Sequence, residues 1–259
     1  MSEPDQEPIK GGVNELVKIG STIHRPAGTW TKQVHELLSY IRSRNFTAAP
    51  EPLGYDENGL EILSFLEGNI GAYPITEEAR TDEALVSSAK LLRQYHDSTV
   101  GFAAKHMDGW QHPARQPVEV ICHGDYGPHN CLFEHGQAVG IIDFDTAHPG
   151  PRVWDVAYAV YRFAPLTQGE VPKGLDDIKN QAKRMRLFCD GYGITEADRS
   201  KLIDVVRNRL KALVESMKEQ AAAGNLGFQE HIRRGDADLY LKDVAYIDRH
   251  REHLVKVLN

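Results

Sequence analysis

One segment in the middle of the chain constrains the fold more than any other. It reads as a short apolar strand over 118–122, a polar loop with the sequence His-Gly-Asp-Tyr-Gly-Pro-His-Asn, and a hairpin over 131–142. Asp125 follows the end of the strand, and Asn130 stands five residues further along. Asp143 ends the second hairpin strand, which brings it back beside Asn130 because hairpin strands run antiparallel. The spacing therefore predicts that two carboxylates and an amide converge at one end of the hairpin.

Such a group of side chains suits phosphoryl transfer. A carboxylate can orient an attacking hydroxyl and receive its proton, and hard oxygen ligands can hold magnesium against a triphosphate. Positioning and charge neutralisation dominate this chemistry, since little covalent work is required of the protein. On this interpretation Asp125 is the catalytic base, and Asn130 and Asp143 bind Mg²⁺. Asp145 is either a second metal ligand or a solvated acid.

These residues resemble the motifs of a known family. The pattern His-Gly-Asp-x4-Asn, followed by Ile-Asp-x-Asp, is similar to the aminoglycoside phosphotransferase family, the small-molecule branch of the protein-kinase-like fold. Residues 152–157 match the family's Arg-x-x-Asp-x-Ala helix start, 91–97 resemble a helix end and 188–193 a recurring helical segment. The resemblance covers residues 13–225 and is strongest in the C-terminal part.

The resemblance implies an α+β, protein-kinase-like two-lobe fold, and the hydrophobic pattern agrees with it. The expected lobes are a small, truncated β-rich N-terminal lobe with its hinge at 1–68 and a larger helical lobe with the catalytic hairpin at 69–259. The expected elements of the small lobe are a loose leader at 1–12, two short strands within 13–25, a helix over 31–43 and a strand pair within 53–65.

The larger lobe is predicted to be mainly helical. One helix should end near His96, after which residues 97–117 read as a long connection. A second helix should begin at Thr195 and continue to Gly224, and a single last helix should carry the apolar residues within 239–258.

The nucleotide-binding part departs from the family pattern. The chain has no GxGxxG or Walker A motif, and Arg25 stands where the family has a strand lysine. Arg25 is the predicted phosphate contact, although arginine is not geometrically equivalent to lysine. The glutamate expected four residues before Leu38 is replaced by Val34, so the ion pair should be altered or absent and the nucleotide affinity weak. The hinge is expected to hold the base through the backbone of Ser64, Phe65, Leu66 and Glu67.

Two residues are assigned to structural support of the site. His123 is expected to hydrogen-bond to the backbone and hold the catalytic loop. Asp155 should bond the backbone of the same loop from a helix N-terminus, where a carboxylate is electrostatically favoured.

A zinc site is an alternative interpretation of the same segment, because Cys122, His123, His129 and Cys131 are zinc-ligand types. The spacing lacks a paired Cys-x-x-Cys, and strand alternation would direct Cys122 and His123 to opposite faces. The two cysteines are therefore expected to be small buried apolar residues.

Composition limits the partners. The chain has 30 basic and 37 acidic residues, a net charge of −7, which argues against a broad nucleic-acid surface. No apolar run approaches the ~18 residues of a membrane span. The N-terminus lacks the features of a signal peptide, and three cysteines fit a reducing compartment. We therefore expect a cytoplasmic protein without nucleic-acid or membrane partners, and the oligomeric state stays open.

The favoured function is transfer of the γ-phosphate of ATP or GTP to a hydroxyl of a small molecule, with Mg²⁺. The acceptor should lie between the catalytic loop and the helices after residue 175. There Asp190, Asp236 and Asp238 could bind an amine-bearing acceptor, or form a solvated face. The alternative is a binding or bacteriocin-immunity-type protein that keeps the fold with little catalysis, which the altered N-terminal lobe favours.

Overall fold

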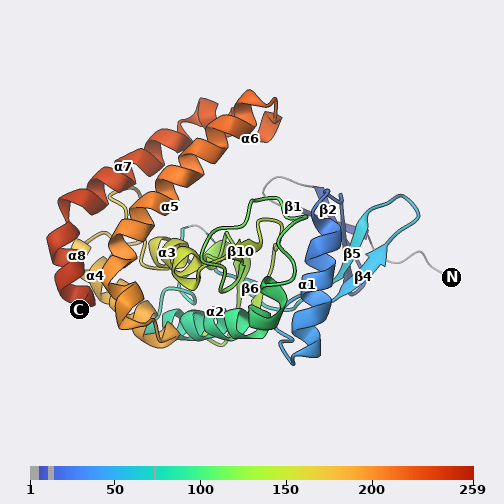
Figure 1. Cartoon of the computed structure of the whole chain (residues 1–259), viewed down its shortest axis with the longest axis horizontal. Helices are drawn as coiled ribbons and strands as arrows, with labels where there is room; N and C mark the ends of the chain where they lie inside the picture. The colour runs from blue at the N-terminus through green and yellow to red at the C-terminus, as the bar shows by residue number, and fades with distance from the viewer. Residues whose placement is uncertain (1–5, 11–14, 73) are drawn as a thin grey trace.

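The N-terminal lobe is a five-stranded antiparallel sheet with helix α1 (Thr31–Ser43) packed against it (Figure 1). The computed structural model describes residues 6–10, 15–72 and 74–259. Residues 1–5 of the predicted leader and the predicted strand start at 13–14 lie outside the described residues. The strands are β1 (Gln6–Lys10), β2 (Glu15–Ile19), β3 (Thr22–Arg25), β4 (Pro52–Tyr55) and β5 (Glu61–Ser64). They follow the order β1-β2-β3-β5-β4, so the leader is not loose throughout: residues 6–10 pair with β2.

The local sequence explains these elements. Helix α1 has its predicted bounds because Val34, Leu37, Leu38 and Ile41 recur at helical spacing, and all four are buried. The β2–β3 turn contains Gly20, whose φ of +60° lies in the left-handed region that favours glycine.

The C-terminal lobe is mostly helical and contains two small sheets. Its helices are α2 (Asp82–Ala103), α3 (Arg152–Phe163), α4 (Ile178–Tyr192), α5 (Glu196–Ala222), α6 (Leu226–Arg234), α7 (Asp236–Arg249) and α8 (Arg251–Leu258). Its strands are β6 (Asn69–Ile70), β7 (Val120–Cys122), β8 (Cys131–Glu134), β9 (Gln137–Ile141) and β10 (His148–Gly150). β7 pairs with β10, and the second sheet has the order β6-β8-β9. None of the helices in the described part of the chain combines the length and the apolar character that crossing a membrane requires.

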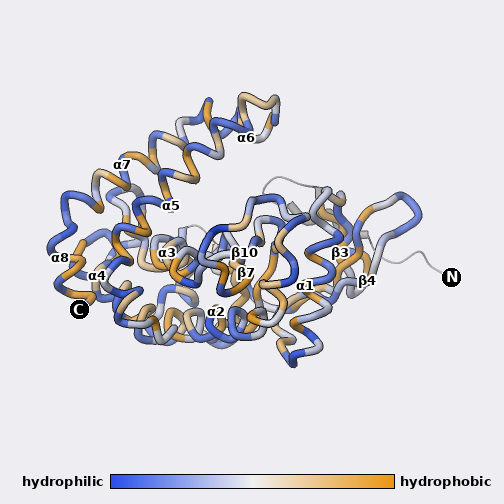
Figure 2. The backbone as a smooth tube through the Cα atoms, in the orientation of Figure 1, coloured by the Kyte–Doolittle hydropathy of each residue, from blue (hydrophilic) through white to orange (hydrophobic). Residues whose placement is uncertain are grey.

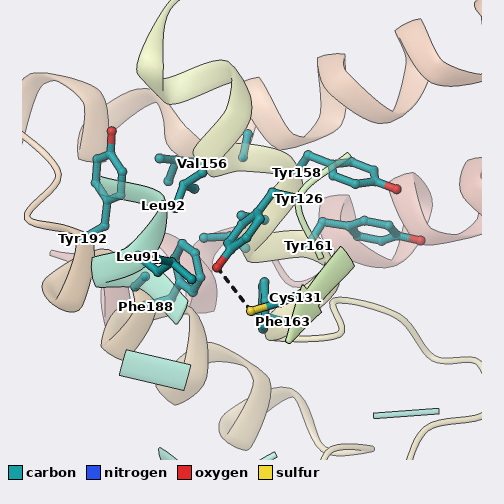
Figure 3. Close-up of a cluster of buried hydrophobic side chains, with 14 of the residues drawn as sticks. Leu91, Leu92, Tyr126, Cys131, Val156, Tyr158, Tyr161, Phe163, Phe188 and Tyr192 are labelled. Carbon is teal, nitrogen blue, oxygen red and sulfur yellow. Dashed lines mark hydrogen bonds between the residues drawn. The ribbon is translucent and has the colours of Figure 1, made fainter. Parts of the chain in front are cut away.

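The core of this lobe anchors the loop that carries the site. Figure 2 shows hydrophobic stretches where α2, α3 and β7 lie, and a hydrophilic tip on the β4–β5 hairpin. Tyr126, next to Asp125 in the chain, is fully buried among side chains of α2, α3 and α4 (Figure 3). Its hydroxyl donates to the backbone oxygen of Ser88 at 2.9 Å and lies 3.5 Å from Sγ of Cys131. The loop is therefore fixed from beneath by a large buried side chain.

Two helix predictions are wrong. Helix α2 does not end near His96 but continues to Ala103. Gly101 lies inside it because α1 approaches closely: a Cβ at this position would come within 2.5 Å of the Tyr40 hydroxyl oxygen. The single helix predicted within 239–258 is two helices, α7 and α8, which meet at His250. Helix α6 was not predicted, and Gly235 with φ +82° separates it from α7. Helices α5 and α7 lie side by side, and α6 joins them at the top of Figure 1.

Candidate active site

The loop after β7 is held by a buried carboxylate from α3. Asp155 accepts hydrogen bonds from the backbone N–H groups of His123 at 2.6 Å and Gly124 at 2.9 Å. Its Oδ2 also lies 3.0 Å from Nε2 of His96, whose Nδ1 lies 2.7 Å from the Tyr192 hydroxyl. Burial favours the protonated acid, but the bonds from His96 and the backbone outweigh it and lower the pKa of Asp155 to about 2. These are the backbone bonds that the sequence predicted for Asp155.

The Asp155 contacts predict an acid-sensitive stability. Because the folded pKa of about 2 lies below the ordinary 3.8, the ionised group stabilises the fold above pH 4, and this contribution is lost as the pH falls toward 2. Asp155→Asn should therefore cost roughly 2–3 kcal/mol of unfolding free energy at pH 7, and the difference from the parent should shrink below pH 4. Urea unfolding across this range measures it. Asp97→Asn, on the exposed side of α2, is the matched control; an equal loss there would mean that any carboxylate suffices.

His123 connects the loop to the hairpin. The imidazole is buried, with Nε2 3.0 Å from the backbone oxygen of Ile142 and Nδ1 accepting from the N–H of Asp125 at 3.3 Å. Gly124 has φ +85°, and a side chain there would collide with the backbone oxygen of Thr146. The His123 side chain and the close approach of Gly124 to Thr146 therefore hold the loop of Asp125 against the strand end that precedes Asp143.

Asp125 is an ionised carboxylate at the wall of a cavity. Its side chain is 33% exposed, and its Oδ2 lies 3.1 Å from both Nε2 of His129 and Nδ2 of Asn130. Burial would raise the pKa of Asp125, but the bonds from His129 and Tyr158 and the charge of Arg162 outweigh it and lower the pKa. A carboxylate kept ionised at neutral pH can orient a hydroxyl throughout the reaction. The sequence did not assign Tyr158 or Arg162 to the site, and it considered His129 only as a zinc ligand.

Asp143 belongs to a group of three carboxylates around Arg25. Arg25 lies 3.3 Å from Asp143 Oδ1 and 2.6 Å from Asp145 Oδ1, and it also pairs with the buried Glu61. Burial lowers the pKa of Arg25, but the three carboxylates outweigh this effect and raise it. Burial and the charge of Asp143 raise the pKa of Asp145, although Arg25 opposes the shift. Asp143 has a left-handed φ of +63°, a conformation common where functional residues are held under strain.

The ion pair is altered, one of the two outcomes that the sequence predicted, because the partner of Arg25 comes from a strand and not from helix α1. Glu61 on β5 pairs with Arg25, because β3 and β5 are adjacent and place the two residues opposite each other. His35 of α1 adds a contact from Nε2 to the second Glu61 oxygen at 2.9 Å. The position expected for the glutamate, Val34, is buried in the core. Arg25 is therefore firmly held, and the basis for expecting weak nucleotide affinity is removed.

Asp143 and Asn130 offer oxygen ligands to a divalent cation. The Asp143 carboxylate is half exposed, and carboxylate and amide oxygens are preferred ligands of Mg²⁺. Asn130 donates through Nδ2 to the Asp125 carboxylate and backbone oxygen, so its amide oxygen is the atom that would bind the cation. Mg²⁺ here would take its other ligands from phosphate and water.

The zinc alternative finds no support. Among the residues that the structure describes, no three His, Cys, Asp or Glu side chains are grouped to hold a metal ion. Cys122 and Cys131 are fully buried, as expected, and burial raises the pKa of both thiols.

The hinge residues follow β5, an inner strand of the small sheet, and lead into the C-terminal lobe. The N–H of Ser64 donates to Glu51 at 2.9 Å, and that of Phe65 donates to Ser21 at 2.8 Å. These two N–H groups are thus used within the lobe, so Ser64 and Phe65, two of the four hinge residues predicted to hold the base, do not offer their N–H groups to a ligand.

A cavity of about 500 Å³ lies where the acceptor was expected. Asp125 and Asp143 line it from the loop after β7 and from the end of the hairpin, and residues of α3, α5 and α6 form much of its wall. Asp190, Asp236 and Asp238 do not line it among the described residues. Asp190 pairs with Arg199 at 2.7 Å, Asp236 pairs with His231 and Arg234, and Asp238 is exposed. The three acids suggested for an amine-bearing acceptor therefore lie outside the cavity.

Comparison with known proteins supports the class of this fold. A model of the phosphotransferase enzyme family matches residues 102–188, which hold the catalytic loop, the hairpin and α3. This match confirms the resemblance found in the sequence.

Solved structures of kinases share the architecture. An ethanolamine kinase from Plasmodium vivax has a TM-score of 0.64 at 14% identity, covering 94% of this chain and 81% of that one. An amicoumacin kinase, in complex with AMP-PNP, Ca²⁺ and Ami, also has a TM-score of 0.64, at 12% identity, covering 89% and 88%. These likenesses confirm the α+β, protein-kinase-like two-lobe fold.

One characterised relative is similar in sequence. The trifolitoxin immunity protein of Rhizobium leguminosarum bv. trifolii is 29% identical over 220 residues, covering 82% of this chain and 83% of that protein.

Proposed function

We propose that this protein is a phosphotransferase that moves the γ-phosphate of ATP or GTP to a hydroxyl of a small molecule. One observation carries the proposal: Asp125 and Asp143 border a single cavity. His123 holds the loop that carries Asp125 against the strand end that precedes Asp143. The family match and the kinase neighbours support it.

The roles of the residues follow from their contacts. Residues 1–68 would bind the nucleotide, with its base at the hinge and its phosphates near Arg25, and residues 69–259 would supply the catalytic loop and the acceptor site. Mg²⁺ held by Asn130 and Asp143 would neutralise phosphate charge. Asp125 would accept a hydrogen bond from the acceptor hydroxyl and receive its proton, as the oxygen–phosphorus bond to the acceptor forms and the bond to the nucleoside diphosphate breaks.

A binding or immunity-type protein with little catalysis is the second candidate. The similarity to the trifolitoxin immunity protein favours it. The two candidates differ in one observable, because only a phosphotransferase consumes nucleotide in proportion to the acceptor added.

The test is an acceptor screen. The full chain, given Mg²⁺ with ATP or GTP, should release nucleoside diphosphate in the presence of a hydroxylated compound and not in EDTA. Aminoglycosides, macrolides, hydroxylated amines and hydroxylated acids form the panel, and coupled diphosphate detection is the readout. Nucleotide binding without consumption for any compound would shift the assignment to the immunity-type candidate.

A further inference from the structure

The cavity has a cationic end that the proposed chemistry does not use. Arg115 comes from the connection between α2 and β7, and its guanidinium lies 3.9 Å from the centre of the Trp154 ring. Arg209 comes from α5 and lies 5.4 Å from the Trp154 ring and 4.7 Å from the Tyr158 ring. All four residues line the cavity. Two cations and two aromatic faces therefore share one part of the wall.

Nothing in the described part of the chain neutralises these two arginines by direct pairing. The ion pairs of the described residues include neither of them, although most other arginines have a carboxylate partner. Burial lowers the pKa of Arg115, and the charge of Arg209 lowers it further. The same causes, burial and then the two arginines, lower the pKa of His112. Both cations therefore lie in a partly buried part of the cavity wall, beside the Trp154 ring.

The carboxylates of the cavity lie at its other end. Among the described residues that line it, the acids are Asp125, Asp143 and Asp145, which belong to the catalytic and metal-binding group. The two ends are close, because Arg209 donates to the backbone oxygen of Gly124 at 2.6 Å, and Gly124 precedes Asp125. A small molecule could therefore touch the arginines and present a hydroxyl to Asp125 at the same time.

We propose that the acceptor is an anion: a hydroxylated small molecule that enters the cavity and whose carboxylate or phosphate contacts Arg115 and Arg209. A guanidinium binds either anion through paired N–H donors. A volume of about 500 Å³ suits a small molecule. A polyamine would meet like charges at these two arginines, and the acids among the lining residues described, Asp125, Asp143 and Asp145, belong to the proposed catalytic and metal-binding group. The proposal rests on the proposed phosphotransferase function.

The test uses two probes of similar size and opposite charge. 4-Hydroxyphenylacetate and tyramine share a ring and a hydroxyl, but the first carries a carboxylate and the second an ammonium group. Calorimetric titration of the full chain should show saturable binding of 4-hydroxyphenylacetate, at least tenfold tighter than binding of tyramine. Arg115→Gln should weaken the anion by about 10- to 100-fold, the usual effect of removing one charged hydrogen-bond partner. Lys179→Gln, an equal change of charge at an exposed site on α4, should not change it.

Further arms separate the competing explanations. Arg209→Gln repeats the test from a different element and covers the case in which Arg115→Gln does not fold. Both variants should keep the parent's affinity for Mg²⁺·ATP; a parallel loss of nucleotide binding would assign the arginines to the triphosphate and overturn the proposal. Tighter binding of tyramine, or no saturable binding of 4-hydroxyphenylacetate, would also overturn it. If the anion binds and nucleotide does not, the phosphotransferase function fails while the anion site stands.

Discussion

Asp125→Asn should reduce acceptor-dependent turnover by ~10²–10⁴-fold, the usual effect of removing a positioned general base. The variant keeps the shape of the side chain and one oxygen to accept from His129 Nε2 or Asn130 Nδ2, each 3.1 Å away in the parent. It removes the negative charge that would orient the hydroxyl and receive its proton. Mg²⁺·nucleotide binding should persist, since Asp125 is not the proposed metal ligand.

Two measurements decide this prediction. Nucleoside diphosphate release, with an acceptor from the screen, gives the turnover, and a thermal shift with Mg²⁺·ATP reports binding. Asp190→Asn is the matched control, because it makes the same change in an exposed carboxylate outside the cavity that pairs with Arg199. Unchanged turnover in Asp125→Asn would remove this residue from the reaction.

The centre of the site was predictable because its geometry is local. Asn130 and Asp143 flank one hairpin, and the pairing of Cys131 with Ile141 brings the hairpin ends together whatever the rest of the chain does. The N–H of Ile142 indeed donates to the backbone oxygen of Asn130 at 3.0 Å. The hairpin register therefore places Asn130 and Asp143 near each other, and a hairpin can be predicted from the local sequence.

The remainder of the site depends on contacts between distant segments. Glu61 takes the place of the expected helix glutamate only because β5 pairs with β3, a pairing that no local pattern specifies. Arg115 and Arg209 stand 94 positions apart in the numbering, and both lie beside the ring of Trp154 on α3, one in the connection after α2 and the other on the long helix α5. In the sequence, Arg115 lay in a segment that read only as a connection.

The wrong helix ends have the same origin. Gly101 looks like a helix breaker in isolation, but in the fold it lies inside α2, where a Cβ would come within 2.5 Å of the Tyr40 hydroxyl oxygen of another helix. The apolar residues after 239 follow a helical spacing that continues through His250, where the chain changes direction between α7 and α8. Periodicity indicates which face is buried, and it does not show where packing interrupts the helix.

Asp143→Asn should abolish the stabilisation that Mg²⁺·nucleotide gives the parent. At a hundredfold excess over Kd, a ligand adds about 2.7 kcal/mol, which corresponds to roughly 5–10 °C in Tm for a chain of this size. Asparagine tolerates the left-handed φ of +63° at this position, so the variant removes charge with less backbone penalty than alanine. Without the Asp143 carboxylate, half exposed toward the cavity, the proposed cation keeps only the Asn130 oxygen as a protein ligand from this pair.

The control for this last experiment separates the metal from the arginine. Asp143 also lies 3.3 Å from Arg25, so a loss of nucleotide binding could come from a displaced guanidinium instead of a missing metal ligand. Nucleotide in EDTA removes the cation and leaves Arg25 in place, and the parent under this condition should behave as Asp143→Asn does with Mg²⁺. If the parent keeps its full thermal shift in EDTA, the triphosphate is held by Arg25 without a metal, and Asp143 acts through the guanidinium. If the shift survives in Asp143→Asn but disappears in EDTA, the cation is bound elsewhere and Asp145 becomes its ligand to test.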